Sequence, residues 1–158
     1  MINIPQYLQL AIRLLLVIIL SSNCSRTQHA NRQHLTKEQQ LIKLRQEEAI
    51  LIAQLKENVQ PSQWQILNRK VIRELREYPP KAAQELEVSI GMRSDLNRSL
   101  QQFKAGDLDA QEKGADVLVQ LMRGGFRAET VEQAMDGLEK WIKLLQNFQQ
   151  QHQLEKKT

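Results

Sequence analysis

Aliphatic side chains recur at three- and four-residue steps along most of the chain after residue 35, which is the spacing of amphipathic helices. The first such segment starts at Thr36, which forms a capping box with Gln39. Glu48 interrupts the apolar stripe of this segment. The stripe consists of Leu41, Leu44, Leu51 and Leu55. We predict a helix here whose apolar face needs a covering partner.

Proline and glycine divide the following residues into two further helices. Pro61 suits the first turn of a second helix, and the Pro79-Pro80 pair ends it. A third helix begins at Pro80 or Lys81 and ends before Gly106, which suits a C-terminal cap. The side chains expected to face inward are Trp64, Leu67, Val71, Leu75 and Tyr78 in the second helix, and Ala82, Leu86, Ile90, Leu96, Leu100 and Phe103 in the third.

Two more helices are predicted in the C-terminal third. Asp107 caps a short fourth helix, in which Gly114 is expected to weaken the middle. Thr130 and Gln133 repeat the capping box at the start of a fifth helix, whose apolar stripe is the most regular in the chain. The expected inward positions are Leu108, Ala115, Leu118, Leu121 and Met122, followed by Val131, Ala134, Met135, Leu138, Trp141, Ile142, Leu145 and Phe148.

These segments together predict the fold class. No segment alternates with a period of two, so no sheet is expected. Amphipathic helices with short connections predict an all-α fold, a small antiparallel bundle of four to five helices over residues 35–148. Residues 149–158 are polar and are expected to fray as a C-terminal tail. Alternatively, another chain covers the first helix by coiled-coil packing against Leu41, Leu44, Leu51 and Leu55.

The segment before the bundle indicates export. Arg13 precedes a continuous aliphatic run, residues 14–20, that is too short to span a bilayer as a helix. Small polar residues and Cys24, the only cysteine, follow this run. That order resembles a bacterial lipoprotein signal peptide, although Ser21 and Asn23 stand where the family has an aliphatic and a small residue.

The resemblance implies that residues 1–23 are removed and that Cys24 becomes the acylated first residue of the mature chain. Ser25 after the cysteine resembles the pattern for outer-membrane sorting, so the body would face the periplasm. Residues 24–34 would then be a lipidated, polar tether. The alternatives are an uncleaved short anchor, ordinary secretory cleavage and a mis-set start codon.

Composition and charge exclude several function classes. The net charge of +4 over 158 residues is too small to argue for nucleic acid. The three histidines, His29, His34 and His152, lie outside the predicted bundle and have no metal-ligand spacing. No serine has a catalytic setting, and the Glu47/Glu48 pair is expected on the polar side of its helix. We expect no enzyme activity, no cofactor, no metal and no small-molecule substrate.

One basic face is a candidate partner site. Arg69, Arg73 and Arg76 follow one side of the second helix, beside Trp64. This face could bind an acidic lipid, a glycan or an acidic protein. The favoured interpretation is a solvated face in which Glu74 and Glu77 pair with the arginines.

The sequence thus predicts a membrane-anchored lipoprotein that acts as an interaction, assembly or pilot-type accessory protein and binds another envelope protein. A second hypothesis comes from residues 35–40, "LTKEQQ", which resemble the Leu-Thr-x-x-Gln motif of periplasmic stress chaperones. That resemblance implies a holdase-like chaperone or envelope stress sensor with many unfolded clients. An exclusion or lysis lipoprotein of a mobile element is a third hypothesis.

Overall fold

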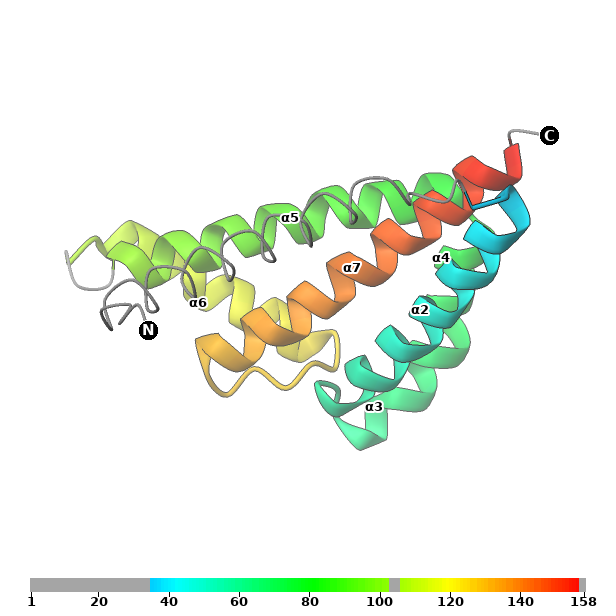
Figure 1. Ribbon diagram of the computed structural model, residues 1–158. Helices are drawn as coiled ribbons and strands as arrows, with labels where there is room; N and C mark the ends of the chain where they lie inside the picture. The colour runs from blue at the N-terminus through cyan, green and yellow to red at the C-terminus, as the bar shows by residue number, and fades with distance from the viewer. Residues whose placement is uncertain (1–34, 103–105, 157–158) are drawn as a thin grey trace, which may run out of the picture. The chain divides into compact units, whose positions relative to one another are not determined.

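The computed structural model of the chain describes residues 35–102 and 106–156, and Lys37–Thr158 form one compact unit. The described residues are helical and contain no strand, so the all-α bundle prediction is confirmed (Figure 1). The elements are α2 (Lys37–Glu57), α3 (Pro61–Ile66), η1 (Leu67–Ile72), α4 (Arg73–Glu77), α5 (Pro79–Gln102), α6 (Leu108–Arg123) and α7 (Val131–Lys156).

Helix α7 is the centre of the bundle. It packs against α5 on one side and α2 on the other (Figure 1). Its predicted apolar stripe is confirmed: Leu138, Trp141, Ile142, Leu145 and Phe148 are all buried. The helix continues to Lys156, however, and the prediction of a frayed tail is wrong for residues 149–156. The polar side chain of Gln151 is buried there, which sequence polarity alone does not indicate.

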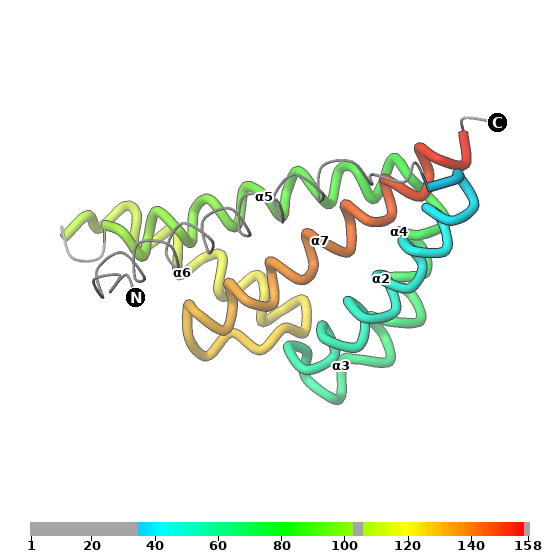
Figure 2. The backbone as a smooth tube through the Cα atoms, viewed as in Figure 1, coloured from blue at the N-terminus to red at the C-terminus, as the bar shows by residue number. Residues whose placement is uncertain are grey.

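Elements α3, η1 and α4 follow one another without a break (Figure 2). The middle element, η1, is a π-helix, in which hydrogen bonds run between residues five apart. Leu67 and Ile72 are separated by that spacing and are both buried. Tyr78, predicted to face inward, is 57% exposed. Tyr78 precedes Pro79 and has an extended backbone, so it lies beyond the end of α4 and does not continue the inward face of that helix.

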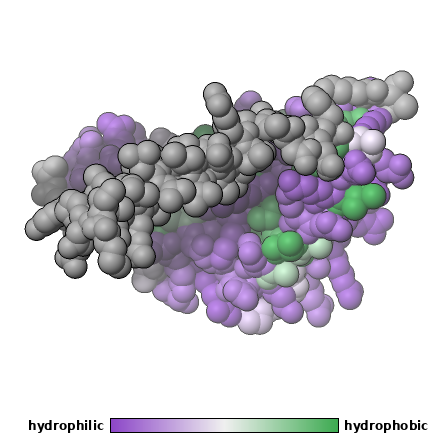
Figure 3. All heavy atoms as spheres, viewed as in Figure 1, coloured by the Kyte–Doolittle hydropathy of each residue, from purple (hydrophilic) through white to green (hydrophobic). Residues whose placement is uncertain are grey.

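The leucine stripe of α2 is covered by the same chain. Leu44 and Leu55 are buried, and Leu51 packs against the core of the bundle, where α7 supplies the facing side chains. Coiled-coil packing with another chain is therefore not needed to cover this face. The outer side of α2 carries two exposed isoleucines, Ile42 and Ile50, and Figure 3 shows hydrophobic side chains over α2 in an otherwise hydrophilic area.

Helix α6 faces its neighbour differently from the prediction. Its start is as expected, because the Ala110 amide donates a hydrogen bond of 3.1 Å to Asp107 Oδ1. Its buried positions are Ala110, Gly114, Val117 and Leu121, whereas Leu108, Ala115 and Met122 are exposed. The reason is the close approach of α5, since a Cβ on Gly114 would overlap the Ser99 side chain. Ile90 and Leu100 of α5, also predicted inward, are each 39% exposed.

The loop after α2 forms backbone hydrogen bonds with the loop before α7. Val59 and Phe126 form an antiparallel bridge, flanked by amide-to-carbonyl hydrogen bonds from Gln60 to Gly125 and from Arg127 to Asn58, both 2.8 Å. The buried Asn58 side chain then bonds two residues of α7. Its Nδ2 donates to Asp136 Oδ2 at 2.9 Å, and its Oδ1 accepts from Lys140 Nζ at 2.8 Å. This clamp fixes one end of the α2–α7 interface.

The clamp predicts a pH dependence of stability. Hydrogen bonds from the Lys140 ammonium and the Asn58 amide lower the pKa of Asp136 below its ordinary value of 3.8. A lowered folded-state pKa stabilises the fold above the unfolded-state value, and this contribution disappears as the pH falls through the folded-state pKa. Because the Asp136 side chain is 56% exposed, solvent screening limits the contribution to about 0.5–1 kcal/mol.

We expect Asp136→Asn to lower the free energy of unfolding by that amount at neutral pH. The difference from the parent protein should shrink as the pH falls below about 3.8, as urea denaturation at a series of pH values would measure. Asp116→Asn, on the exposed side of α6, is the control. A difference that stays constant down to the acid end would contradict the clamp.

Candidate functional site

The predicted basic face is divided in the structure. Arg69 and Arg73 are exposed, and Arg73 Nε lies 2.9 Å from Glu77 Oε1, as the solvated-face interpretation predicts. Glu74 pairs instead with Lys81. Trp64 is partly buried against the core, and Arg76 pairs with Glu48 of α2. The four predicted partner-site residues therefore do not form one surface. Cys24, like residues 1–34 as a whole, lies outside the described residues.

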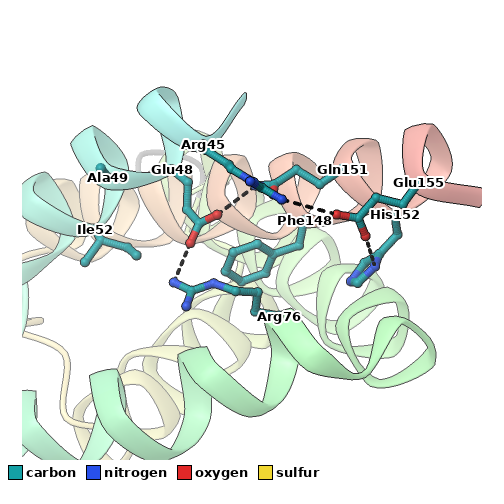
Figure 4. A pocket seen from close by; sticks show the side chains of 9 residues that line it. All are labelled: Arg45, Glu48, Ala49, Ile52, Arg76, Phe148, Gln151, His152 and Glu155. Carbon is teal, nitrogen blue, oxygen red and sulfur yellow. Dashed lines mark hydrogen bonds and ion pairs between the residues drawn. The ribbon is translucent and has the colours of Figure 1, made fainter. Parts of the chain in front are cut away.

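Arg76 leads to a groove between α2, α4 and the C-terminal part of α7 (Figure 4). The groove has a volume of about 480 Å³ and is partly open to solvent. Its walls carry positive, negative, aromatic and aliphatic side chains. The lining residues are Arg45, Glu48, Ala49, Ile52, Arg76, Phe148, Gln151, His152 and Glu155.

A carboxylate lies at the base of this groove. Glu48 is only 7% exposed, because it occupies an inward position of α2 between Leu44 and Leu51. Its Oε1 forms an ion pair with Arg76, and its Oε2 accepts a 2.7 Å hydrogen bond from Gln151 Nε2. Both oxygens therefore have a partner, which a charged group needs when it leaves water. The expectation that Glu48 lies on the polar side of the helix is wrong, whereas Glu47 is exposed as expected.

The hydrogen bonds continue along the α2–α7 interface. Gln151 Nε2 also donates to Asn147 Oδ1 at 2.7 Å, and Asn147 Nδ2 donates to the Leu44 carbonyl at 3.0 Å. Gln151 and Asn147 are both buried. The network therefore joins three helices through side chains with specific partners. Any other register of α2 on α7 would break these hydrogen bonds.

Arg76 is held in place from two sides. Its guanidinium carbon lies 5.8 Å from the centre of the Phe148 ring, in a cation–π arrangement, while its edge meets Glu48. Its side chain remains 47% exposed, so part of the guanidinium faces the groove. Arg76 is thus both a structural ion-pair partner and a group that a ligand can reach.

The outer part of the groove is held more loosely. Arg45 Nη2 and His152 Nδ1 each lie 3.8 Å from a carboxylate oxygen of Glu155. His152 Nε2 is buried and has no hydrogen-bond partner within the described ranges. Figure 4 shows the imidazole below Glu155, with a dashed line joining the two side chains. These groups can donate and accept hydrogen bonds, so the outer part of the groove is suited to a polar ligand group.

Sequence analysis missed Glu48, Gln151 and His152 as members of one site. A signal existed for Glu48: residues 41, 44, 48, 51 and 55 follow strict three- and four-residue steps, and only position 48 is polar. A polar residue at such a position is expected to be buried with a partner. No comparable local signal exists for Gln151, which follows a polar run.

Comparison with protein-family models, with curated proteins and with solved structures finds no match for the chain. Within residues 35–102 and 106–156, no helix is both long and apolar enough to cross a bilayer. The same residues contain no group of three or more histidine, cysteine or acidic side chains placed to hold a metal ion.

The Glu48–Arg76 pair is less exposed than the Glu77–Arg73 pair, so we expect loss of its arginine to destabilise the fold more. Arg76→Ala leaves the Glu48 carboxylate without its cation, although only 9% of that side chain is exposed, and we expect it to lower the free energy of unfolding by about 2 kcal/mol. Arg73→Ala removes a solvated pair on the same helix and should change it by about 0.5 kcal/mol or less. Urea denaturation measures both. Equal effects would contradict the structural role of Arg76.

Proposed function

We propose that this protein is a non-catalytic lipoprotein of the bacterial envelope. Acylated Cys24 holds it at the membrane, and the helical bundle binds another envelope protein through the groove beside α2. The single observation that supports binding most strongly is this groove, which combines two arginines reachable from solvent, a fully paired carboxylate at its base and an aliphatic wall.

The packing of the bundle supports a recognition role. The apolar face of α7 is covered by helices of the same chain, so the bundle is folded without a partner and offers a preorganised surface. Preorganised surfaces lose less conformational entropy on binding. For the anchor, support comes from the sequence alone. The short aliphatic run before the sole cysteine resembles a lipoprotein signal, and two or three acyl chains would give stable attachment.

The anchor is tested by the intact mass of the protein extracted from bacterial membranes. We expect a chain that starts at Cys24 and carries added acyl mass. The Cys24→Ser variant should keep its signal segment or be released without acyl mass, because the thiol is the acceptor. An unmodified full-length parent chain would contradict the lipoprotein assignment.

The binding surface is tested with a photo-crosslinking amino acid in living cells. The probe replaces Ala49, which is exposed on the groove wall, or Ala115, an exposed alanine of α6 away from the groove. We expect one discrete crosslinked product from position 49 and none from position 115. Many products from position 49 would favour the holdase-like chaperone, and the absence of any product would contradict partner binding through the groove.

A further inference from the structure

We infer that the groove beside α2 recognises an acidic side chain of a partner peptide, together with an apolar residue next to it in that peptide. The inference rests on the proposed function and specifies the partner's chemistry. Arg45 and Arg76 would hold the carboxylate, and the apolar residue would lie against Ala49 and Ile52.

The unused hydrogen-bonding capacity of the groove is mainly that of donors. Glu48 already has a partner for each of its oxygens. A guanidinium has five N–H groups. Arg76 uses one edge for Glu48. The side chain of Arg45 is 66% exposed, and its ion pair with Glu155 is long, at 3.8 Å. Both arginines line the groove, and Figure 4 shows them coming from different helices, on either side of the Glu48 carboxylate. A carboxylate is the group that such a pair recognises best among protein side chains.

The negative groups of the groove favour a peptide over a free phosphate. Glu48 and Glu155 line the same space as the arginines. Both carboxylates would repel a doubly charged phosphate more strongly than they repel a side-chain carboxylate, which carries a single charge. A peptide also brings backbone N–H groups, which can donate to Glu155. The mixture of charges in the groove thus matches a chain that has both donors and acceptors.

The apolar wall accounts for the second part of the ligand. Ala49 and Ile52 lie on the groove side of α2, one exposed and the other partly exposed. Phe148 is only 1% exposed, and its ring supports the Arg76 guanidinium instead of meeting a ligand. An apolar side chain beside the acidic one would cover the aliphatic wall and exclude water from the arginine–carboxylate contact. Exclusion of water strengthens that contact.

The experiment is a selection of phage-displayed random heptapeptides on the full-length protein in detergent. It is repeated on Arg45→Gln, which removes a groove cation that is well exposed, and on Arg69→Gln, which removes an exposed arginine outside the groove. We expect peptides with Asp or Glu beside an apolar residue to be enriched on the parent protein and on Arg69→Gln. Enrichment should be lost on Arg45→Gln.

Synthetic versions of one enriched peptide then give dissociation constants. We expect replacement of its acidic residue by the amide, or Arg45→Gln in the protein, to weaken binding about tenfold, as for a lost hydrogen bond between charged groups. Tighter binding of a phosphoserine version would overturn the preference for a carboxylate. Selection without acidic residues, equal binding to Arg45→Gln, or no selected peptide would overturn the inference as a whole. A discrete crosslink from position 49 in any of these cases would leave the proposed function standing.

Discussion

The carboxylate of Glu48 constrains the arrangement of three helices. A charge at an inward position of α2 destabilises the bundle unless a cation and hydrogen-bond donors meet it. Arg76 on α4 supplies the cation, and Gln151 on α7 supplies the donor. Asn147 extends the network to the backbone of α2. If α2 were displaced along α7 by one turn, each of these groups would lose its partner, whereas an interface of leucines alone would tolerate the displacement better.

The π-helical element η1 is part of the same arrangement. An α-helix from Pro61 to Glu77 would keep one face throughout, but a π-turn adds a residue and rotates the helical turns after it. The rotation lets Leu67 and Ile72 both pack inward and sets the direction in which α4 presents Arg76. An element with an unusual backbone geometry therefore lies directly before the ion pair of the groove, and π-turns occur frequently at functional sites.

The sequence predicted the features that short-range chemistry determines. The fold class, the break at Pro79 and the caps at Asp107 and Thr130 depend on residues within a few positions of one another. It did not predict the inward face of α6, because that face depends on how closely Ser99 approaches Gly114. It also placed Glu48 in solvent, since the partners that make its burial possible lie 28 and 103 positions further along the chain. The anchor at Cys24 stays a prediction.

The distance along the chain between α2 and α7 has a consequence for biogenesis. Helix α2 cannot complete its packing before α7 is present, because the contacts of Leu44 and Glu48 with α7 span 103 residues. Contacts of that separation form late and slow the folding of a small domain. During synthesis, α2 would therefore expose its leucines and its charged Glu48 until α7 has emerged. The groove would then exist only once α7 is complete, so that an unfinished or shortened molecule would lack this surface altogether.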